Sequence, residues 1–172
     1  MARFTHTISL LTDVAKLQQE YDQPATVTLL APLIENVRLD LAPLLAQVGG
    51  ALEVAVGATP TLPLAEKNLR SVVYNLVSNA FKYHDPARPA RVVVRSRVEA
   101  PYLVLEVQDS GLGLDLTREQ QLFTMFRRFH THVEGSGVGL YMVKKMVENA
   151  GGKIGVASKL GQGSTFSVYL PG

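Results

Sequence analysis

The order of the strand-like segments constrains the fold of this chain more than any other feature. Four segments fall into two consecutive pairs, residues 90–98 (ARVVVRSRV) with 102–109 (YLVLEVQD), and 153–158 (KIGVAS) with 164–170 (STFSVYL). Each pair is joined by a short turn, so its strands are expected to run antiparallel. Helical patterns at 65–83 and 138–149 precede the pairs. We therefore expect an α+β two-layer sandwich, with about three helices covering one face of a mixed, largely antiparallel sheet of about five strands.

The remaining segments extend this plan. We expect a short strand in 25–30, a helix over 31–47 that ends at Gly49-Gly50, a strand over 52–56, a loop over 57–63, and an irregular stretch over 111–136 with one short helix near Glu119. Residues 4–20 place apolar side chains at helical spacing. The chain contains no internal repeat.

Composition excludes several classes of protein. The chain has 172 residues and 47% hydrophobic residues, enough for one domain with a sizeable core. Its net charge is only +2 and no dense basic run occurs, so we expect no nucleic-acid or membrane contact. The absence of cysteine excludes disulfides and thiolate metal sites. No apolar run reaches the roughly 18–20 residues that span a bilayer, and the composition fits a cytoplasmic location.

A polar stripe runs along the predicted helix 65–83. Asn75, Asn79 and Lys82 lie at positions i, i+4 and i+7, beside the apolar stripe that should be buried. Asparagine is a mediocre helix former, so two of them in mid-helix suggest a function. Amide oxygens suit Mg²⁺ and a lysine suits a phosphate. An ordinary solvated face explains this stripe equally well when the helix is considered alone.

A carboxylate continues the buried row of the strand 102–109. Asp109 follows Leu105 and Val107 on the same side of that strand. A buried carboxylate needs hydrogen-bond donors, and the exocyclic amino group of adenine could supply one. Gly111 and Gly113 would let a flat ligand approach the backbone. An aspartate of a tight turn remains the alternative.

Three alternating glycines, Gly135, Gly137 and Gly139, precede the helix predicted at 138–149. Free N–H groups at a helix start favour a phosphate. The stretch lacks the Gly-Lys-Ser/Thr ending of a P-loop, and no strand precedes it as a dinucleotide-binding loop requires. A flexible loop tip is the alternative. His130 and His132 lie upstream without an evident third ligand, so a zinc site is not expected.

These motifs follow one another in a specific order. The order is N-x-x-x-N-A-x-K-Y, D-x-G-x-G, F-x-x-F, G-x-G-x-G-L and G-x-G-S-x-F. Over residues 25–171 it resembles the ATP-binding catalytic domain of bacterial sensor histidine kinases, in the superfamily that includes gyrase, heat-shock chaperone and mismatch-repair ATPases. The stretch FRRFHTHVEGSGVGLYMVKKMVENAGG is most similar to kinases of the phytochrome and PAS-linked type.

The resemblance implies that the chain takes ATP and Mg²⁺. Asn79 and Asn75 match the asparagine box that holds Mg²⁺ against the triphosphate, and Lys82 and Tyr83 match its nucleotide-contacting end. Asp109 matches the carboxylate that receives the adenine amino group. Gly111 and Gly113 match the glycines that flank this carboxylate. Phe123 and Phe126 match the aromatic box of the mobile ATP lid, and Arg128 matches the basic residue after it. The second glycine box, which forms the hinge of the lid, is matched by Gly135, Gly137, Gly139 and Leu140. Ser164 stands where the family often has threonine.

Two differences from known members of the superfamily bear on the class of protein that this sequence resembles. Relatives that hydrolyse ATP carry a glutamate at the position of Asn75, and an amide cannot act as a general base. Asn75 therefore favours a histidine kinase, and we expect no general base in this chain. The phosphoacceptor histidine that such kinases carry in a helical hairpin has no match here, because the sequence after His6 does not fit.

The resemblance also implies a domain division and partners. We expect residues 1–22 to be the end of a dimerisation helix plus a linker, and residues 23–172 to be the catalytic domain. The partners would be the dimerisation and phosphoacceptor helices of a parent kinase, which could be membrane-bound, and through it a response-regulator receiver domain. Alone, the chain should not phosphorylate itself. The alternatives are a non-catalytic nucleotide-sensing scaffold and, less compatible with Asn75, a self-sufficient ATPase.

Overall fold

A computed structural model describes residues 12, 15, 26–57, 61–125 and 137–172. Most of the segment 1–22 and the stretch 126–136 lie outside the described residues, and with them the expected helix at 4–20. The helices are α2 (Leu30–Asp40), α3 (Ala42–Val48), α4 (Glu66–Lys82), the 3-10 turn η1 (Leu116–Arg118), α5 (Glu119–Leu122) and α6 (Gly139–Asn149). The strands are β1 (Val27–Leu29), β2 (Ala51–Ala55), β3 (Thr61–Pro63), β4 (Arg91–Glu99), β5 (Tyr102–Asp109), β6 (Lys153–Lys159) and β7 (Gly163–Pro171).

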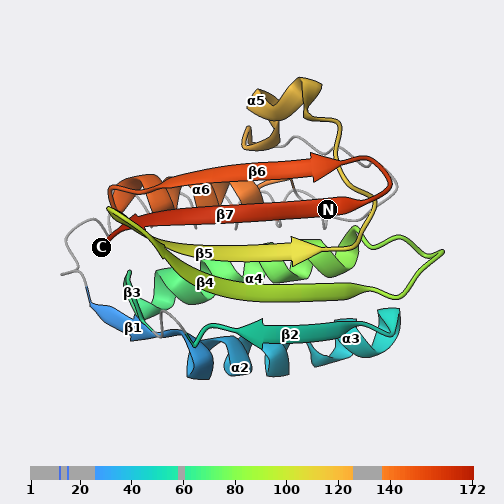
Figure 1. Ribbon diagram of the computed structural model, residues 1–172, viewed down its shortest axis with the longest axis horizontal. Coiled ribbons are helices and arrows are strands. Elements are labelled where there is room, and N and C mark those ends of the chain that lie inside the picture. Colours follow the sequence, from blue (N-terminus) through green and yellow to red (C-terminus); the bar gives the residue numbers. More distant parts are fainter. Residues whose placement is uncertain (1–11, 13–14, 16–25, 58–60, 126–136) are drawn as a thin grey trace.

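Five of the described strands form one sheet in the order β2-β4-β5-β7-β6, and β1 and β3 form a separate two-stranded sheet (Figure 1). Both predicted hairpins are present, since β4 pairs antiparallel with β5, and β6 with β7. The parallel pair is β2 with β4, whose connection runs through α4 and so provides the long crossover that parallel strands need. The expected mixed, largely antiparallel sheet is confirmed.

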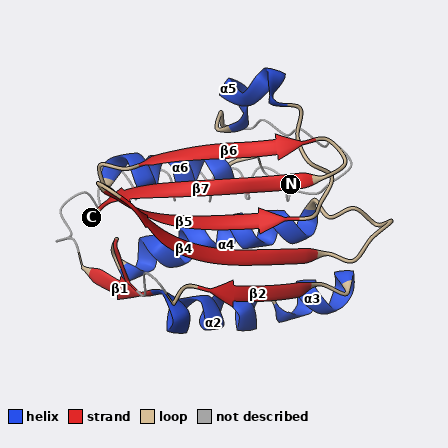
Figure 2. Ribbon diagram, in the orientation of Figure 1, coloured by secondary structure: helices blue, strands red, loops and turns tan. Residues whose placement is uncertain are grey.

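The helices α2, α3, α4 and α6 lie on one face of this sheet, while α5 lies beyond the β6 edge (Figure 2). The predicted stripe of α4 faces the core, where Leu69, Val72, Val73 and Val77 are all fully buried. Alternate residues of β5 and β7 meet it from the sheet side, among them Leu105 and Val168. The two-layer sandwich therefore has one core between its layers.

Two expectations were wrong in detail. The helix expected over 31–47 is divided into α2 and α3, because the chain departs from helical geometry at Leu41 and Pro43 then starts a new helix at a position where proline needs no hydrogen bond. The loop expected over 57–63 contains β3, which pairs antiparallel with β1. Among the described residues, no helix combines the length and hydrophobicity that crossing a bilayer requires.

Candidate functional site

Asp109 is the last residue of β5 and lies on the side of the strand that faces the helices. Its Oδ1 accepts hydrogen bonds from the backbone N–H of Gly111 at 2.8 Å and of Ser164 at 3.3 Å. None of the described residues donates to its other carboxylate oxygen. Burial raises the pKa of Asp109 to about 6, against the opposing effects of the two N–H donors and the positive charge of Arg88. The carboxylate is thus fixed through one oxygen and can accept from a ligand through the other.

The turn after Asp109 is held against the end of α4. Leu112 N–H donates to Tyr83 O at 3.0 Å, and an added Cβ on Gly111 would overlap that same carbonyl. Arg88, in the loop between α4 and β4, holds this turn in place, because its Nε donates to Ser110 O and its Nη2 donates to Gly111 O, each at 2.7 Å. No sequence pattern marks Arg88 as a site residue, because its partners are backbone carbonyls that leave no signature in the sequence.

The start of β7 lies beside the same carboxylate. Gly163 adopts φ 114°, and an added Cβ there would overlap the backbone oxygen of Asp109, so only glycine fits. The next residue, Ser164, is 7% exposed, and its Oγ lies 2.7 Å from Ser158 Oγ. The expected site residue Gly113 lies at the same end of the site. It has φ 70°, and an added Cβ there would overlap the backbone oxygen of Lys159. Gly163 and Ser158 are further site residues that the sequence analysis did not single out, although Gly163 lies within its last motif.

The polar stripe of α4 lies where α6 begins. Asn75 Nδ2 donates to Ser71 O at 2.8 Å, which turns Oδ1 toward Gly139, where an added Cβ would lie 2.6 Å from that oxygen. Asn79 is half-exposed one turn further on, and Lys82 is exposed. The N-cap residue of α6 makes no side-chain hydrogen bond to the helix, and the first N–H groups of a helix have no partner within the helix itself, which suits an anionic ligand. The structure therefore places Asn75 of the asparagine stripe next to Gly139, the last glycine of the Gly135–Gly137–Gly139 motif.

The donor set of this stripe fits a hard cation. Among the described residues no three His, Asp or Glu side chains come close enough to hold a metal ion. The amide oxygen of Asn79, which makes no hydrogen bond to the described residues, is a neutral hard ligand of the kind that Mg²⁺ accepts alongside phosphate oxygens. A cation held by Asn79 together with a phosphate chain is consistent with these residues.

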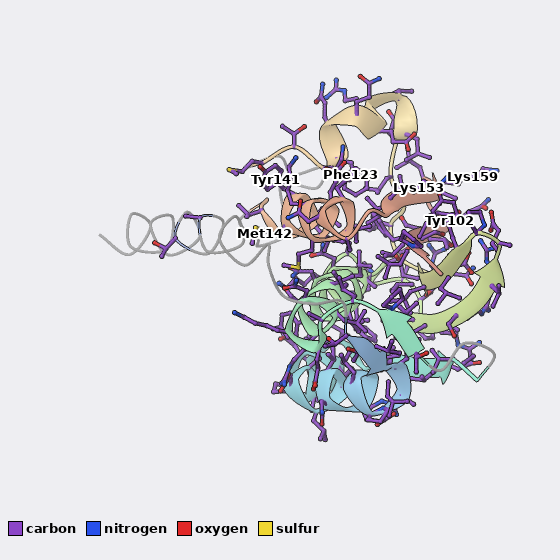
Figure 3. All side chains as sticks on the ribbon, turned by 90° about the vertical axis from the view of Figure 1, so that its left-hand side faces the viewer. Tyr102, Phe123, Tyr141, Met142, Lys153 and Lys159 are labelled. Atoms are coloured by element: carbon purple, nitrogen blue, oxygen red, sulfur yellow. The ribbon has the colours of Figure 1, made fainter. Side chains whose placement is uncertain are left out.

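The expected lid is described only in part. Phe126, Arg128 and Gly135 lie outside the described residues. Phe123, labelled in Figure 3, lies at the end of α5. It packs edge-on against Phe166 with ring centroids 6.4 Å apart, and Lys144 of α6 lies over its ring at 5.8 Å. Gly137 has φ 72°, and Leu140 in the first turn of α6 is half-buried against the core. The described start of the expected lid thus packs against β7 and α6, and its described end leads into α6.

These groups define a class of protein. The site combines three features on an α+β sandwich. The Asp109 carboxylate at the end of β5 is bonded through one oxygen, glycine turns surround it, and the polar stripe of α4 lies beside the N-terminus of α6, which has no side-chain cap. Such a site is suited to a nucleotide. Comparison with known proteins agrees. Residues 65–172 match the family of histidine kinase-, DNA gyrase B- and HSP90-like ATPases, and the chain belongs to this family.

The relatives are sensor kinases. The chain is 31% identical over 159 residues to the phytochrome-like protein Cph1 of Synechocystis. This match covers 91% of the present chain and 21% of Cph1. It is 38% identical over 109 residues to the circadian input-output histidine kinase CikA of Synechococcus elongatus, covering 61% of this chain and 14% of that protein. The chain therefore spans less than a quarter of the length of these relatives.

Solved structures, a histidine kinase among them, share the fold. Full-length ShkA matches with a TM-score of 0.76 and 25% identity, over 97% of this chain and 36% of that one. The Acinetobacter baumannii histidine kinase AdeS matches with a TM-score of 0.74 and 19% identity, over 97% of this chain and 77% of that one. The expected likeness to the ATP-binding domain of sensor histidine kinases is confirmed, and the family is one of ATP-binding domains.

Proposed function

We propose that the chain binds Mg-ATP and donates the γ-phosphate to a histidine on the dimerisation and phosphoacceptor helices of a two-component signalling kinase. The observation that carries this proposal is Asp109, a carboxylate fixed by two backbone N–H groups with its second oxygen unused by the described residues. An adenine amino group would donate to that oxygen. The ShkA structure, which was solved in complex with AMPPNP, supports a nucleotide as the ligand.

The two ends of the site, one at Tyr83 and one at Asn75, are separated along α4, so one could hold the base and the other the triphosphate of this ligand. Tyr83 abuts the turn beside Asp109, and Asn75 lies eight residues earlier, which is about 12 Å along a helix. The base would lie at the Tyr83 end against Asp109, Gly111, Gly113 and Ser164. The triphosphate would extend along α4 past Lys82 and Asn79 toward Asn75 and the start of α6, where Gly137, Gly139 and Leu140 lie. Phe126, Arg128 and Gly135 would close over it as the lid.

The chain's own residues would position the reactants and neutralise charge. Mg²⁺, when bound with ATP, would neutralise part of the phosphate charge as the γ-phosphoryl group leaves. Asn79 and Asn75 would orient the metal-bound phosphates, Lys82 would add a positive charge, and the N–H groups of α6 would hold phosphate oxygens. An acceptor imidazole is already nucleophilic, so the amide of Asn75 suffices where a hydroxyl or water nucleophile would need a base.

The domain division enters the same proposal. Residues 1–22 would be the end of the second dimerisation helix plus a linker, and residues 23–172 the catalytic domain. The receiver domain of a response regulator would be the final recipient of the phosphate, through the parent kinase. A cytoplasmic location suits a domain that uses ATP.

Titration with ATP tests the binding step. Wild type should bind Mg-ATP, and Asp109→Asn, which places an amide beside the adenine amino group, should bind it at least about 10-fold more weakly, as expected when a charged hydrogen bond is lost. Unchanged affinity in this variant would overturn the adenine assignment. Glu53→Gln, an exposed carboxylate change on β2, is the matched control and should leave the affinity unaltered.

Phosphoryl transfer is tested with a separate hairpin. When radiolabelled ATP is supplied, the label should pass to the histidine of an intact dimerisation hairpin added in trans, while the chain itself stays unlabelled. Binding of ATP without transfer would favour a nucleotide-sensing scaffold. Steady ATP turnover without the hairpin would favour a self-sufficient ATPase.

A further inference from the structure

Ser158, near the end of β6, joins three hydrogen bonds at the base end of the candidate site. It pairs across the sheet with Ser164 of β7. Its Oγ lies 2.9 Å from Gly163 O, 2.7 Å from Ser164 Oγ and 2.8 Å from Leu114 N. One hydroxyl group therefore contacts three polar atoms, and its single proton can serve only one of them.

The chemistry of the three partners fixes the direction of each bond. Gly163 O is a carbonyl oxygen that can only accept, so Ser158 must donate its proton there. The Leu114 N–H can only donate, so Ser158 Oγ accepts from it. The short contact with Ser164 then requires the Ser164 hydroxyl to donate, because Ser158 has no second proton.

This arrangement decides what Ser164 can offer to a ligand. Its proton is directed to Ser158, so on its remaining side its oxygen can only accept a hydrogen bond. Ser164 lies next to Asp109, since its N–H donates to Oδ1 of that residue at 3.3 Å. An ionised carboxylate also only accepts. The side chains of Ser164 and Asp109 can therefore only accept hydrogen bonds from a ligand.

We propose that Ser158 is a specificity-determining residue, which takes the Ser164 proton and so leaves the side chains of Ser164 and Asp109 as hydrogen-bond acceptors for the nucleobase. The inference rests on the proposed binding of a nucleotide and extends it to the choice of base. A 6-amino purine supplies the donors that these acceptors need, directly or through water. A 6-oxo purine presents an acceptor at position 6 and leaves the acceptor that faces this position unpaired, which disfavours its binding. Without Ser158, the Ser164 hydroxyl could rotate and donate to the oxo group.

The test compares ATP with ITP, which carries a 6-oxo group in place of the amino group. Dissociation constants of both nucleotides are measured for wild type and Ser158→Ala. Wild type should prefer ATP, and the ratio of the ITP constant to the ATP constant should fall about 2- to 10-fold in Ser158→Ala, the range expected for one hydrogen bond gained by the wrong base. In a Ser164→Ala background, the Ser158→Ala change should leave the ratio unaltered, because no hydroxyl remains to rotate.

Three results would overturn the proposal. One is an equal loss of affinity for both nucleotides in Ser158→Ala, which would mean that Ser158 only supports the backbone. Another is a wild type that binds ATP and ITP equally well. The third is a Ser158→Thr variant, which keeps the hydroxyl, with the ratio of the alanine variant. If Ser158→Ala does not fold, Ser158→Cys, whose thiol is a poor acceptor, takes its place with the same expected direction. A wild type that binds neither nucleotide would instead contradict the proposed function.

Discussion

Asp109 combines partial burial with a short list of donors, and the balance between them can be measured without any ligand. Desolvation raises its pKa from the ordinary value of 3.8 to about 6. Between these two values the folded protein binds more protons than the unfolded chain. The contribution of Asp109 to the free energy of unfolding therefore falls as the pH rises through this window.

The variant Asp109→Asn removes this titration. We expect the free energy of unfolding of the variant, minus that of wild type, to increase from pH 4 to pH 7, because only wild type must ionise a partly buried group. Urea unfolding of the nucleotide-free proteins across this range measures the difference. Asp115→Asn is a suitable control, since the pKa of this exposed carboxyl is lowered, not raised. A difference that stays constant with pH would contradict the raised pKa of Asp109.

The sequence predicted some site residues better than others, and hydrogen-bond partners explain why. Asp109 could be found because its place in the alternating strand pattern requires it to face the core. Arg88 could not, since it acts on the carbonyls of Ser110 and Gly111, which any residue type would provide. Ser158 was missed for the same reason, as its role depends on partners from three segments of the chain.

At the scale of elements, the contact between α4 and α6 is set by a small residue. Gly139 opens α6 next to the amide of Asn75, with no room for a Cβ between them. The backbone of Gly139 is helical, so alanine there would be favourable if space were available. Gly139→Ala should therefore destabilise the protein by about 1–3 kcal/mol, the usual result of overpacking.

A double-mutant cycle checks the origin of this loss. In an Asn75→Ala background the obstructing oxygen is gone, and Gly139→Ala should then be neutral or slightly stabilising. Unfolding free energies of the four proteins give the coupling between the two positions. Equal losses in both backgrounds would mean that another neighbour requires the glycine.

Element boundaries show where sequence patterns reach their limit. The two hairpins could be predicted because their strands alternate and are joined by short turns. The strand β3 was missed because its three residues gain strand geometry only by pairing with β1, more than 30 residues earlier. The division of the helix at Leu41 was missed, although Pro43 favours a helix start and not a helix interior.

At the scale of the whole molecule, ligand binding to the folded chain raises its free energy of unfolding. A nucleotide that binds only the folded chain stabilises it by about 2.7 kcal/mol at 100 times its dissociation constant. The polar stripe of α4 and the start of α6 belong to helices that pack on the same core, so occupation of the site should raise the stability of the whole domain.

Removal of Mg²⁺ separates the two parts of this stabilisation. We expect ATP to raise the free energy of unfolding more with Mg²⁺ than with EDTA, because the cation links the phosphates to an amide oxygen. Asn79→Ala should lose the Mg²⁺-dependent part and keep the part that ATP provides in EDTA. Asn36→Ala, an exposed asparagine in the middle of α2, should keep both. Unfolding curves at saturating ATP measure these increments. An Mg²⁺-dependent increment in Asn79→Ala as large as in wild type would place the cation on other ligands.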